Sequence, residues 1–423
     1  MPPAVNMEKR QKLFALRDLN LFQAGAMVWM LGTISGYFIY RLGGGGLYRD
    51  GYNLPSMLPM GIDFGYVYGY GAALREGISS YSAAGSGYPP LITILLLPLT
   101  YFPPHTAYRI YVLVLILALF SMIYLCLREG GRAGGAAGFF QALAISSVLY
   151  FSYPFNFALE RGNSDLLAGA FAVISLFAMT RGRFFLSVIA LAAATQFKLY
   201  PAILIAVLFL RFGFRSLLWF ILLNAAALLM LGWTPVLQFV AILKTMATAP
   251  STWEGNHSIY SYVASLAAKG TIFSGSQALF RDGFYFCSLG LFAAAWLKYW
   301  LSSLKPISPA AAPRRLNGAE IGLVGMSFCL MTLIPSVSYD YKLVLQAMPF
   351  LLLTSREDTQ LFALPAWSRL AAVLAGGLLS LSLIPRDILT LLKTPWLLLL
   401  FLLYFCLAFF GKAERGLTGQ EKT

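Results

Sequence analysis

The stretch YVLVLILALFSMIYLCL, residues 111–127, holds no charged side chain and comes close to the length of a membrane-spanning helix. The hydrocarbon core of a bilayer needs about 20 consecutive apolar residues in helical form. Similar apolar runs recur at residues 19–40, 284–300 and 396–410. Only 11% of the chain is charged, whereas an average soluble domain carries about 25% charged residues. We therefore predict an all-α polytopic membrane protein, with residues 1–423 forming a single integral membrane domain.

The basic residues indicate how the chain threads the membrane. Lysine and arginine gather in clusters between the apolar runs, which is typical of loops held at the cytoplasmic face. If every cluster is cytoplasmic, the spans come in pairs and both termini lie inside. About 12 transmembrane helices satisfy this rule, at 19–40, 107–127, 136–153, 165–180, 184–197, 200–212, 216–232, 283–303, 318–335, 341–354, 367–385 and 393–411. This topology explains the net charge of +14, and no motif predicts a nucleic-acid partner.

Two long segments fall on the outer side of this topology. The first outer loop, residues 41–106, contains a predicted helix near 63–77 and an apolar stretch at 88–102 that we expect to be interfacial or re-entrant. The second outer loop, residues 233–282, is expected to form short interfacial helices. The four cysteines lie within apolar runs, which predicts free thiols and neither a disulfide framework nor a metal site.

Residues 184–210 can be read as one helix or as two. A single helix would be about 40 Å long at 1.5 Å per residue, and it would bury Lys198 in the middle of the membrane. Pro201 disfavours helical structure at the residue before it. We therefore predict two short helices that are broken at KLYP, residues 198–201, in a hollow open to the outer side.

The first outer loop carries the sequence IDFGYVYGY, residues 62–70. Asp63 stands at the start of a predicted aromatic helix, where a carboxylate could act as a general base toward a sugar hydroxyl. The rings of Tyr66 and Tyr70 could stack on the apolar faces of a pyranose. The simpler interpretation is an inert acid that the helix dipole stabilises.

Four further groups on the predicted outer face are candidates for carrying chemistry. Arg161, in ERGNSD, offers a planar fork of donors that suits a phosphate. Lys198 lies at membrane depth, where an anionic partner is expected. His257, in GNHS, and Lys342, in SYDYK, fall on the same face. The structural alternatives are helix capping by Asn163 or Asp165, snorkelling of Lys198, a hydrogen-bonded loop histidine, and an interfacial belt around Lys342.

Several common catalytic motifs are absent from the chain. It contains no HExxH zinc site, no phosphate-binding P-loop, no GxSxG nucleophile elbow and no Asp-x-Asp pair near Asp63. Zinc hydrolysis, ATP-driven pumping and nucleotide-sugar chemistry therefore lack their usual residues.

The order of the motifs resembles glycosyltransferase family 87 of the GT-C superfamily. After the acid and its aromatics come YPPL at 88–91, RGN at 161–163, KLYP at 198–201 and NHSI at 256–259. The family includes polyprenol-phosphate-mannose-dependent α-1,2-mannosyltransferases, and the resemblance covers roughly residues 60–350. It implies a GT-C-type glycosyltransferase fold and an enzyme that uses a polyprenyl-phosphate sugar at the outer face and inverts its anomeric carbon. Many relatives have Gly-Gln-x-Asn around Asn163, and this departure leaves the partner of Asn163 open.

The resemblance assigns a role to each matching position. Asp63 is expected to be the general base. Fixed arginine and lysine charges can stabilise a leaving lipid phosphate, so neither a metal nor another cofactor is expected. Donor phosphate binding falls to Arg161, Lys198, His257 and Lys342. The expected substrate-binding residues are Tyr66, Tyr70, Tyr88, Asn163, Tyr200, Asn256 and Tyr341.

Together these features predict transfer of a sugar, most simply mannose, from a polyprenyl-phosphate donor to a glycolipid or glycan acceptor. The expected location is the bacterial cytoplasmic membrane, where membrane lipids surround the protein and the active site faces the outer side. Three alternatives stay open: a transporter or flippase of a lipid-linked sugar, a non-catalytic subunit of a cell-envelope assembly complex, and an enzyme of the same class that uses arabinose or glucose.

Overall fold

The computed structural model describes residues 61–79, 81, 87–129, 142–143, 145–146, 149, 152–248, 256–303, 314–354, 370–371, 374–376 and 386–410. The predicted spans at 19–40, 136–153 and 367–385 lie wholly or mostly outside these residues. The same holds for the basic clusters at the two ends of the chain.

The described residues are almost entirely helical, as predicted, and their only β-type pairing is an isolated bridge between Asn256 and Tyr339. The α-helices and 3₁₀-helices (η) are α3 (Ile62–Arg75), α5 (Pro90–Leu96), η3 (Leu97–Tyr101), α6 (Pro104–Glu129), α8 (Tyr153–Arg161), α9 (Asp165–Thr180), α10 (Phe184–Phe197), η4 (Tyr200–Leu204), α11 (Ile205–Phe212), α12 (Phe214–Leu229), α13 (Trp233–Thr248), α14 (Ile259–Ala268), η5 (Ser274–Ser276), α15 (Gln277–Ser303), α16 (Gly318–Leu333), η6 (Asp340–Gln346), α17 (Ala347–Thr354) and α19 (Arg386–Phe410).

Three described helices, α6, α15 and α19, contain segments long and apolar enough to cross a membrane alone. Two bent helix pairs pass the same test as units: α8 with α9, bent by 114°, and α12 with α13, bent by 104°. Each bend contains a glycine in the left-handed region, Gly162 with φ 61° and Gly232 with φ 93°, which other residues adopt only with strain. The chain is a multi-pass helical membrane protein, but the predicted number of spans is not confirmed.

Several predicted boundaries agree with the structure. The predicted spans at 165–180 and 184–197 coincide with α9 and α10, and the helix predicted near 63–77 is α3. The predicted break is confirmed, because α10 ends at Phe197 and Lys198 is extended, with φ −153° and ψ 138°. The stretch predicted at 88–102 forms α5 and η3, which together are too short to cross a membrane.

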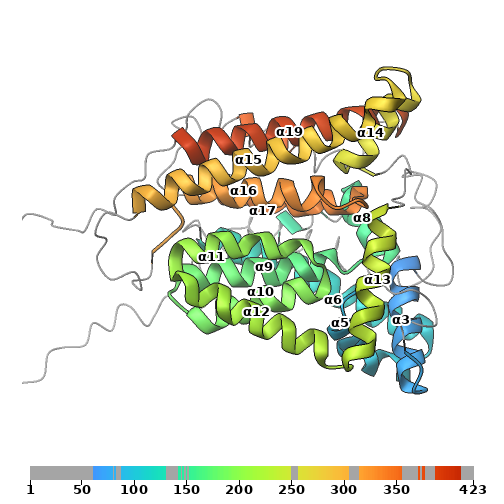
Figure 1. Cartoon of the computed structure of the whole chain (residues 1–423). Helices are drawn as coiled ribbons and strands as arrows, with labels where there is room; N and C mark the ends of the chain where they lie inside the picture. Colours follow the sequence, from blue (N-terminus) through green and yellow to red (C-terminus); the bar gives the residue numbers. More distant parts are fainter. Residues whose placement is uncertain are drawn as a thin grey trace, which may run out of the picture.

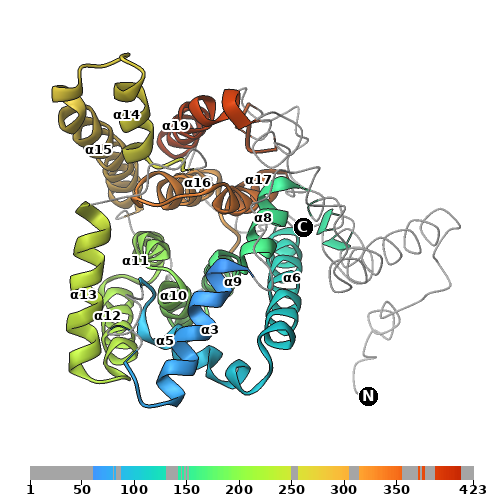
Figure 2. The same ribbon diagram turned by 90° about the vertical axis from the view of Figure 1, so that its right-hand side faces the viewer.

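The long helices form two layers that run side by side. One layer contains α15, α16, α17 and α19, and the other contains α6, α9, α10, α11 and α12 (Figure 1). The helices α3 and α13 lie crosswise at one end of the bundle (Figure 1). Seen from that end, in Figure 2, they stand in front of the layer that contains α9 and α10. The candidate site lies at this end.

The backbones of α16 and α19 touch where α16 has glycines. A Cβ atom on Gly322 would lie 2.5 Å from the Ala408 nitrogen, and one on Gly325 would overlap the ring of Tyr404. Small residues at such crossings let membrane helices approach closely and gain van der Waals contact. This closely packed pair belongs to the layer whose α16 end lines the candidate site.

Candidate functional site

A cavity of about 740 Å³ lies at the end of the bundle where α3 and α13 cross it. Its polar lining is rich in tyrosine and in cations and contains Asp63, Tyr66, Tyr70, Tyr88, Arg161, Lys198, Tyr200, Ser336, Tyr339, Tyr341 and Lys342. Its apolar lining contains Pro89, Leu199, Ile203, Leu243, Met246, Leu330, Met331, Ile334, Pro335 and Val337, and Gly87 completes the wall. The size and the mixed lining are typical of a pocket for a small ligand or for part of a larger one.

One wall of the cavity holds the acid that the sequence singled out. Arg161 donates from Nε to Oδ2 of Asp63 at 2.9 Å and from Nη2 to Oδ1 at 2.8 Å. Asn163 donates a third hydrogen bond to Oδ2 at 2.6 Å, and its own Oδ1 accepts one from the backbone nitrogen of Asp165. Asn163 therefore holds the carboxylate and also accepts a hydrogen bond from the first backbone N–H of α9, whose N-cap residue is Ser164. The partner that the sequence left open for Asn163 is Asp63.

Two glycines bring this wall together. Gly162 takes a left-handed conformation at the end of α8, and a Cβ atom there would lie 2.5 Å from Cβ of Phe64. Gly61, just before α3, packs so closely on the carbonyl groups of Glu160 and Arg161 that no larger side chain fits. The first turn of α3 thus rests directly on the turn between α8 and α9.

Aromatic rings surround the guanidinium group of Arg161. Its Cζ lies 5.6 Å from the ring centroid of Phe157, 5.5 Å from that of Tyr339 and 5.8 Å from that of Tyr341. Cation–π attraction of this kind adds to the bidentate ion pair with Asp63. Two of the five N–H donors of Arg161 therefore orient Asp63. The role predicted for Arg161 in phosphate binding stays a prediction.

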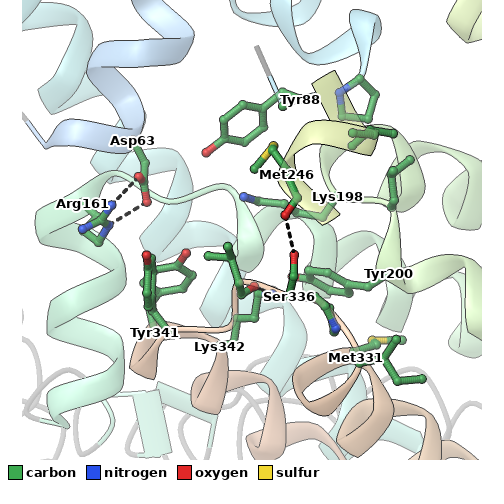
Figure 3. A pocket seen from close by; sticks show the side chains of 18 of the residues that line it. Asp63, Tyr88, Arg161, Lys198, Tyr200, Met246, Met331, Ser336, Tyr341 and Lys342 are labelled. Carbon is green, nitrogen blue, oxygen red and sulfur yellow. Dashed lines mark hydrogen bonds and ion pairs between the residues drawn. The ribbon is translucent and has the colours of Figure 1, made fainter. Parts of the chain in front are cut away.

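The opposite side of the cavity carries Lys198 at the break after α10 (Figure 3). Its Nζ lies 3.6 Å from Oδ1 of Asp165 and 4.3 Å from the ring centroid of Tyr88. Asp165 is 0% exposed, and the hydroxyl group of Tyr200 also interacts with its carboxylate. The anionic partner expected for Lys198 is therefore Asp165, which the sequence indicated only as a helix cap.

Lys342 provides the third cation of the cavity. It is 4% exposed, its Nζ donates to the carbonyl oxygen of Val337 at 2.7 Å, and it lies 4.8 Å from the ring centroid of Tyr200. No carboxylate of the described residues forms an ion pair with it. With all five groups ionised, three cations and two carboxylates give the site a formal charge of +1. Burial lowers the pKa of Lys342 to about 7, and a bound anion would favour its charged form.

Comparison with known families agrees with this geometry. A family model described as glycosyltransferase family 87 matches residues 87–333, which is more than half of the chain. The chain belongs to glycosyltransferase family 87. It is thus a membrane glycosyltransferase, as the order of motifs predicted. No curated protein matches it.

The part of this family 87 chain that matches the family model includes Arg161, Lys198 and Asp165 but neither Asp63 nor Lys342. The structure nevertheless brings all five side chains together at one cavity or directly behind its wall. The predicted substrate residues Tyr66, Tyr70, Tyr88, Tyr200 and Tyr341 line the same cavity. The sequence analysis did not assign Tyr339 or Ser336 to the site, although Tyr339 lies within the SYDYK motif and Ser336 lies two residues before it.

Three predicted site residues are not part of the cavity lining: Asn163, which is 0% exposed behind Asp63, and His257 and Asn256. His257 is 0% exposed and its Nε2 lies 2.5 Å from Oδ1 of Asp340, while Asn256 bonds to the backbone of residues 336 and 338. Burial lowers the pKa of His257 below its usual value. Burial alone would raise the pKa of Asp340, but the charges and hydrogen bonds of His257 and Lys393 hold it at about 2. In this geometry His257 supports the wall rather than facing a ligand.

Proposed function

We propose that this family 87 protein transfers a single sugar, with mannose as the first candidate, from a polyprenyl-phosphate donor to a glycolipid or glycan acceptor. Asp63 is the general base, and the anomeric carbon is inverted. The reaction takes place at the outer face of the bacterial cytoplasmic membrane, with both termini on the inner side. The whole chain acts as one membrane domain.

The main support for the proposal is the charge balance of the cavity. Asp63 is paired with Arg161, and Asp165 is paired with Lys198, which leaves Lys342 without a counter-ion among the described residues. A polyprenyl-phosphate sugar is a phosphodiester with one negative charge, and it would complete this balance. A diphosphate donor would bring more negative charge than one lysine offsets, and it would call for a divalent cation.

The positions of the charges favour an inverting displacement. Asp63 and Arg161 lie on one side of the cavity, and Lys198 lies across from them (Figure 3). In such a reaction the acceptor oxygen attacks the anomeric carbon from one side while the phosphate leaves from the other. The C–O bond to the phosphate breaks with its electron pair on the phosphate oxygen, and Lys198 and Lys342 stabilise that charge.

The hydrogen bonds of Asp63 leave room for its role as a base. An ionised carboxylate can accept about four hydrogen bonds, and Oδ1 and Oδ2 together accept three from Arg161 and Asn163. The remaining lone pair can accept the proton of an acceptor hydroxyl.

The apolar part of the lining suits the polyprenyl chain. Leu243 and Met246 come from α13, and Leu330, Met331 and Ile334 come from the end of α16. A lipid that enters here would keep its tail in an apolar environment and place its phosphate between the two lysines. Met246 and Leu243 belong to the bent segment after α12, so the predicted second outer loop contributes to the donor site.

The experiment is sugar transfer by purified protein in vesicles, with polyprenyl-phosphate mannose as the donor. Asp63→Asn should lower the transfer rate by about 10²–10⁴-fold, because it removes general-base catalysis while it keeps the shape of the side chain. Asp282→Asn is the matched control, because Asp282 is half exposed and, among the described residues, forms its one ion pair with its neighbour Arg281. We expect its transfer rate to equal that of the wild type.

Equal transfer by the Asp63→Asn and wild-type proteins would exclude Asp63 as the base. Parallel assays with polyprenyl-phosphate glucose and arabinose identify the sugar. An assay with a polyprenyl-diphosphate sugar tests the charge argument, and faster transfer from that donor would overturn it.

A further inference from the structure

Behind the cavity wall lies a chain of three buried ionisable side chains that the proposed reaction does not use. Asp340, the first residue of η6, is 3% exposed, and its Oδ1 lies 2.5 Å from both Nε2 of His257 and Nζ of Lys393. His257 precedes α14, and Lys393 belongs to α19. Three separate segments of the chain therefore meet at one carboxylate oxygen.

This cluster is attached to the cavity wall. The backbone nitrogen of His257 donates to the carbonyl oxygen of Ser338 at 2.7 Å, and Asn256 Oδ1 accepts from the Ser338 nitrogen at 2.9 Å. Directly after Asp340 come Tyr341 and Lys342, which line the cavity. A displacement of Asp340 would therefore move the tyrosine beside Arg161 and the lysine that carries the excess charge.

The arrangement sets the charges of the cluster. With Lys393 as the counter-ion of Asp340, His257 can stay neutral and donate its Nε2–H to the carboxylate. Its Nδ1 has no hydrogen-bond partner among the described residues, so a second proton there would be a buried donor without an acceptor, which is costly. The charged groups that act on His257 are Asp340 and Lys342 from η6 and Lys393 from α19.

We propose that Lys393, Asp340 and His257 are positioning residues for donor binding, and that Lys393 keeps His257 neutral by balancing the charge of Asp340. The part of this inference that concerns donor binding rests on the proposed function, whereas the part that concerns the charge of His257 does not. Lys393 and Asp340 both lie outside the region that matches the family model.

The first test removes the charges singly and together. Lys393→Met leaves Asp340 without its lysine and Asp340→Asn leaves Lys393 without its acid, and breaking a buried pair in this way is strongly destabilising. In the double variant both charges are gone, and the amide oxygen can still accept the His257 hydrogen bond. We expect the Michaelis constant for the donor to rise at least about tenfold in each single variant, with kcat per folded protein nearly unchanged. The double variant should return to within about threefold of the wild type.

The second test measures the melting temperature of the purified protein against pH. In the wild type the pKa of His257 lies below its unfolded value, so the unfolded state binds more protons and stability falls as pH drops below about 6.5. In Lys393→Met the Asp340–His257 pair should hold one proton to a pH above 6.5, because a net charge is costly there. Its stability should then fall as pH rises through that value, with the opposite slope.

Lys269→Met is the control for both tests, because Lys269 is exposed at the end of α14 and forms no ion pair with any described residue. We expect its Michaelis constant for the donor, and the slope of its melting temperature against pH, to equal those of the wild type. A double variant no better than the single variants, or equal slopes for Lys393→Met and Lys269→Met, would overturn the inference. Opposite slopes without transfer from any polyprenyl-phosphate donor would instead refute the proposed function and leave the charge assignment standing.

Discussion

The two sides of the cavity differ in how their charges are balanced. On the α3 side, Asp63 accepts three hydrogen bonds from Arg161 and Asn163, and the guanidinium is further enclosed by aromatic rings. On the other side, Lys198 has one acid at 3.6 Å, while Lys342 contacts a carbonyl oxygen and a ring and has no ion-pair partner among the described residues. One side is complete before any ligand arrives, and the other becomes complete only when an anion binds.

This difference separates two demands on a transferase. A base must be held in a fixed direction, because small misplacements of reacting groups cost much of the rate. A phosphate site must instead gain free energy when the ligand binds, so it cannot be neutralised in advance. Substitutions on the α3 side should therefore lower stability, whereas substitutions of the lysines should lower donor affinity with little loss of stability.

The largest effect is expected from Arg161→Met. It leaves the buried Asp63 without its cation, which should lower the free energy of unfolding by about 3–5 kcal/mol and abolish measurable transfer. Chemical denaturation in detergent measures the first effect. The double variant with Asp63→Asn should recover most of the stability but none of the transfer. A double variant as unstable as Arg161→Met would show that the loss of stability does not come from the unpaired Asp63.

Lys342→Met should act in the opposite direction. It removes a buried cation that has no acid partner, so the stability should stay the same or increase. Donor affinity should fall by about 10–100-fold, because a hydrogen bond to a charged group contributes about 1.5–3 kcal/mol. Titration with polyprenyl phosphate measures it, and Lys269→Met is the control. A loss of stability with intact affinity would contradict the proposed excess charge.

Gly162→Ala tests whether the α3 side depends on its close backbone contact. The substitution forces a left-handed alanine against Phe64 and should cost about 1–3 kcal/mol of stability together with part of the transfer rate. Gly77→Ala is matched in φ but has open space around it. Its cost should be only the backbone strain, and equal losses in both variants would rule out the contact with Phe64 as the cause.

The smallest effect is expected at Tyr66, which is 50% exposed at the cavity and stacks on Tyr70 with ring centroids 6.4 Å apart. If its ring stacks on the acceptor, Tyr66→Ala should raise the Michaelis constant for the acceptor up to about tenfold, which corresponds to about 0.5–1.5 kcal/mol. Tyr66→Phe keeps the ring and should behave like the wild type. If both substitutions raise the Michaelis constant equally, the hydroxyl group of Tyr66 binds the acceptor and its ring does not.

Much of the helical framework could be predicted from the sequence because it depends on local signals. The polar turn at residues 181–183 predicts where α9 ends and α10 begins. Pro201 predicts the break after α10. The grouping of Asp63, Lys198 and Lys342 followed from sidedness, since Lys and Arg clusters restrict which loops share a face.

The rest depends on contacts between distant segments. The α12–α13 bend falls at Gly232, where the predicted span 216–232 ends, but the position of α13 across the end of the bundle depends on tertiary contacts. His257 matched a family motif, but its burial depends on Asp340 and on Lys393, a residue of the last helix. Asp165 looked like a helix cap, and only the fold places Lys198 beside it. Periodicity and composition carry no information about such pairs.

The glycines at which α16 meets α19 limit how this protein can vary. Any side chain at Gly322 would meet the backbone at Ala408, and any at Gly325 would meet the ring of Tyr404. Moving the helices apart to accommodate it would also separate Ile334 at the cavity from Lys393 behind it. We therefore expect homologous sequences to tolerate substitution over most of the lipid-facing surface while keeping glycine at both positions, and an alignment of such sequences can test this directly.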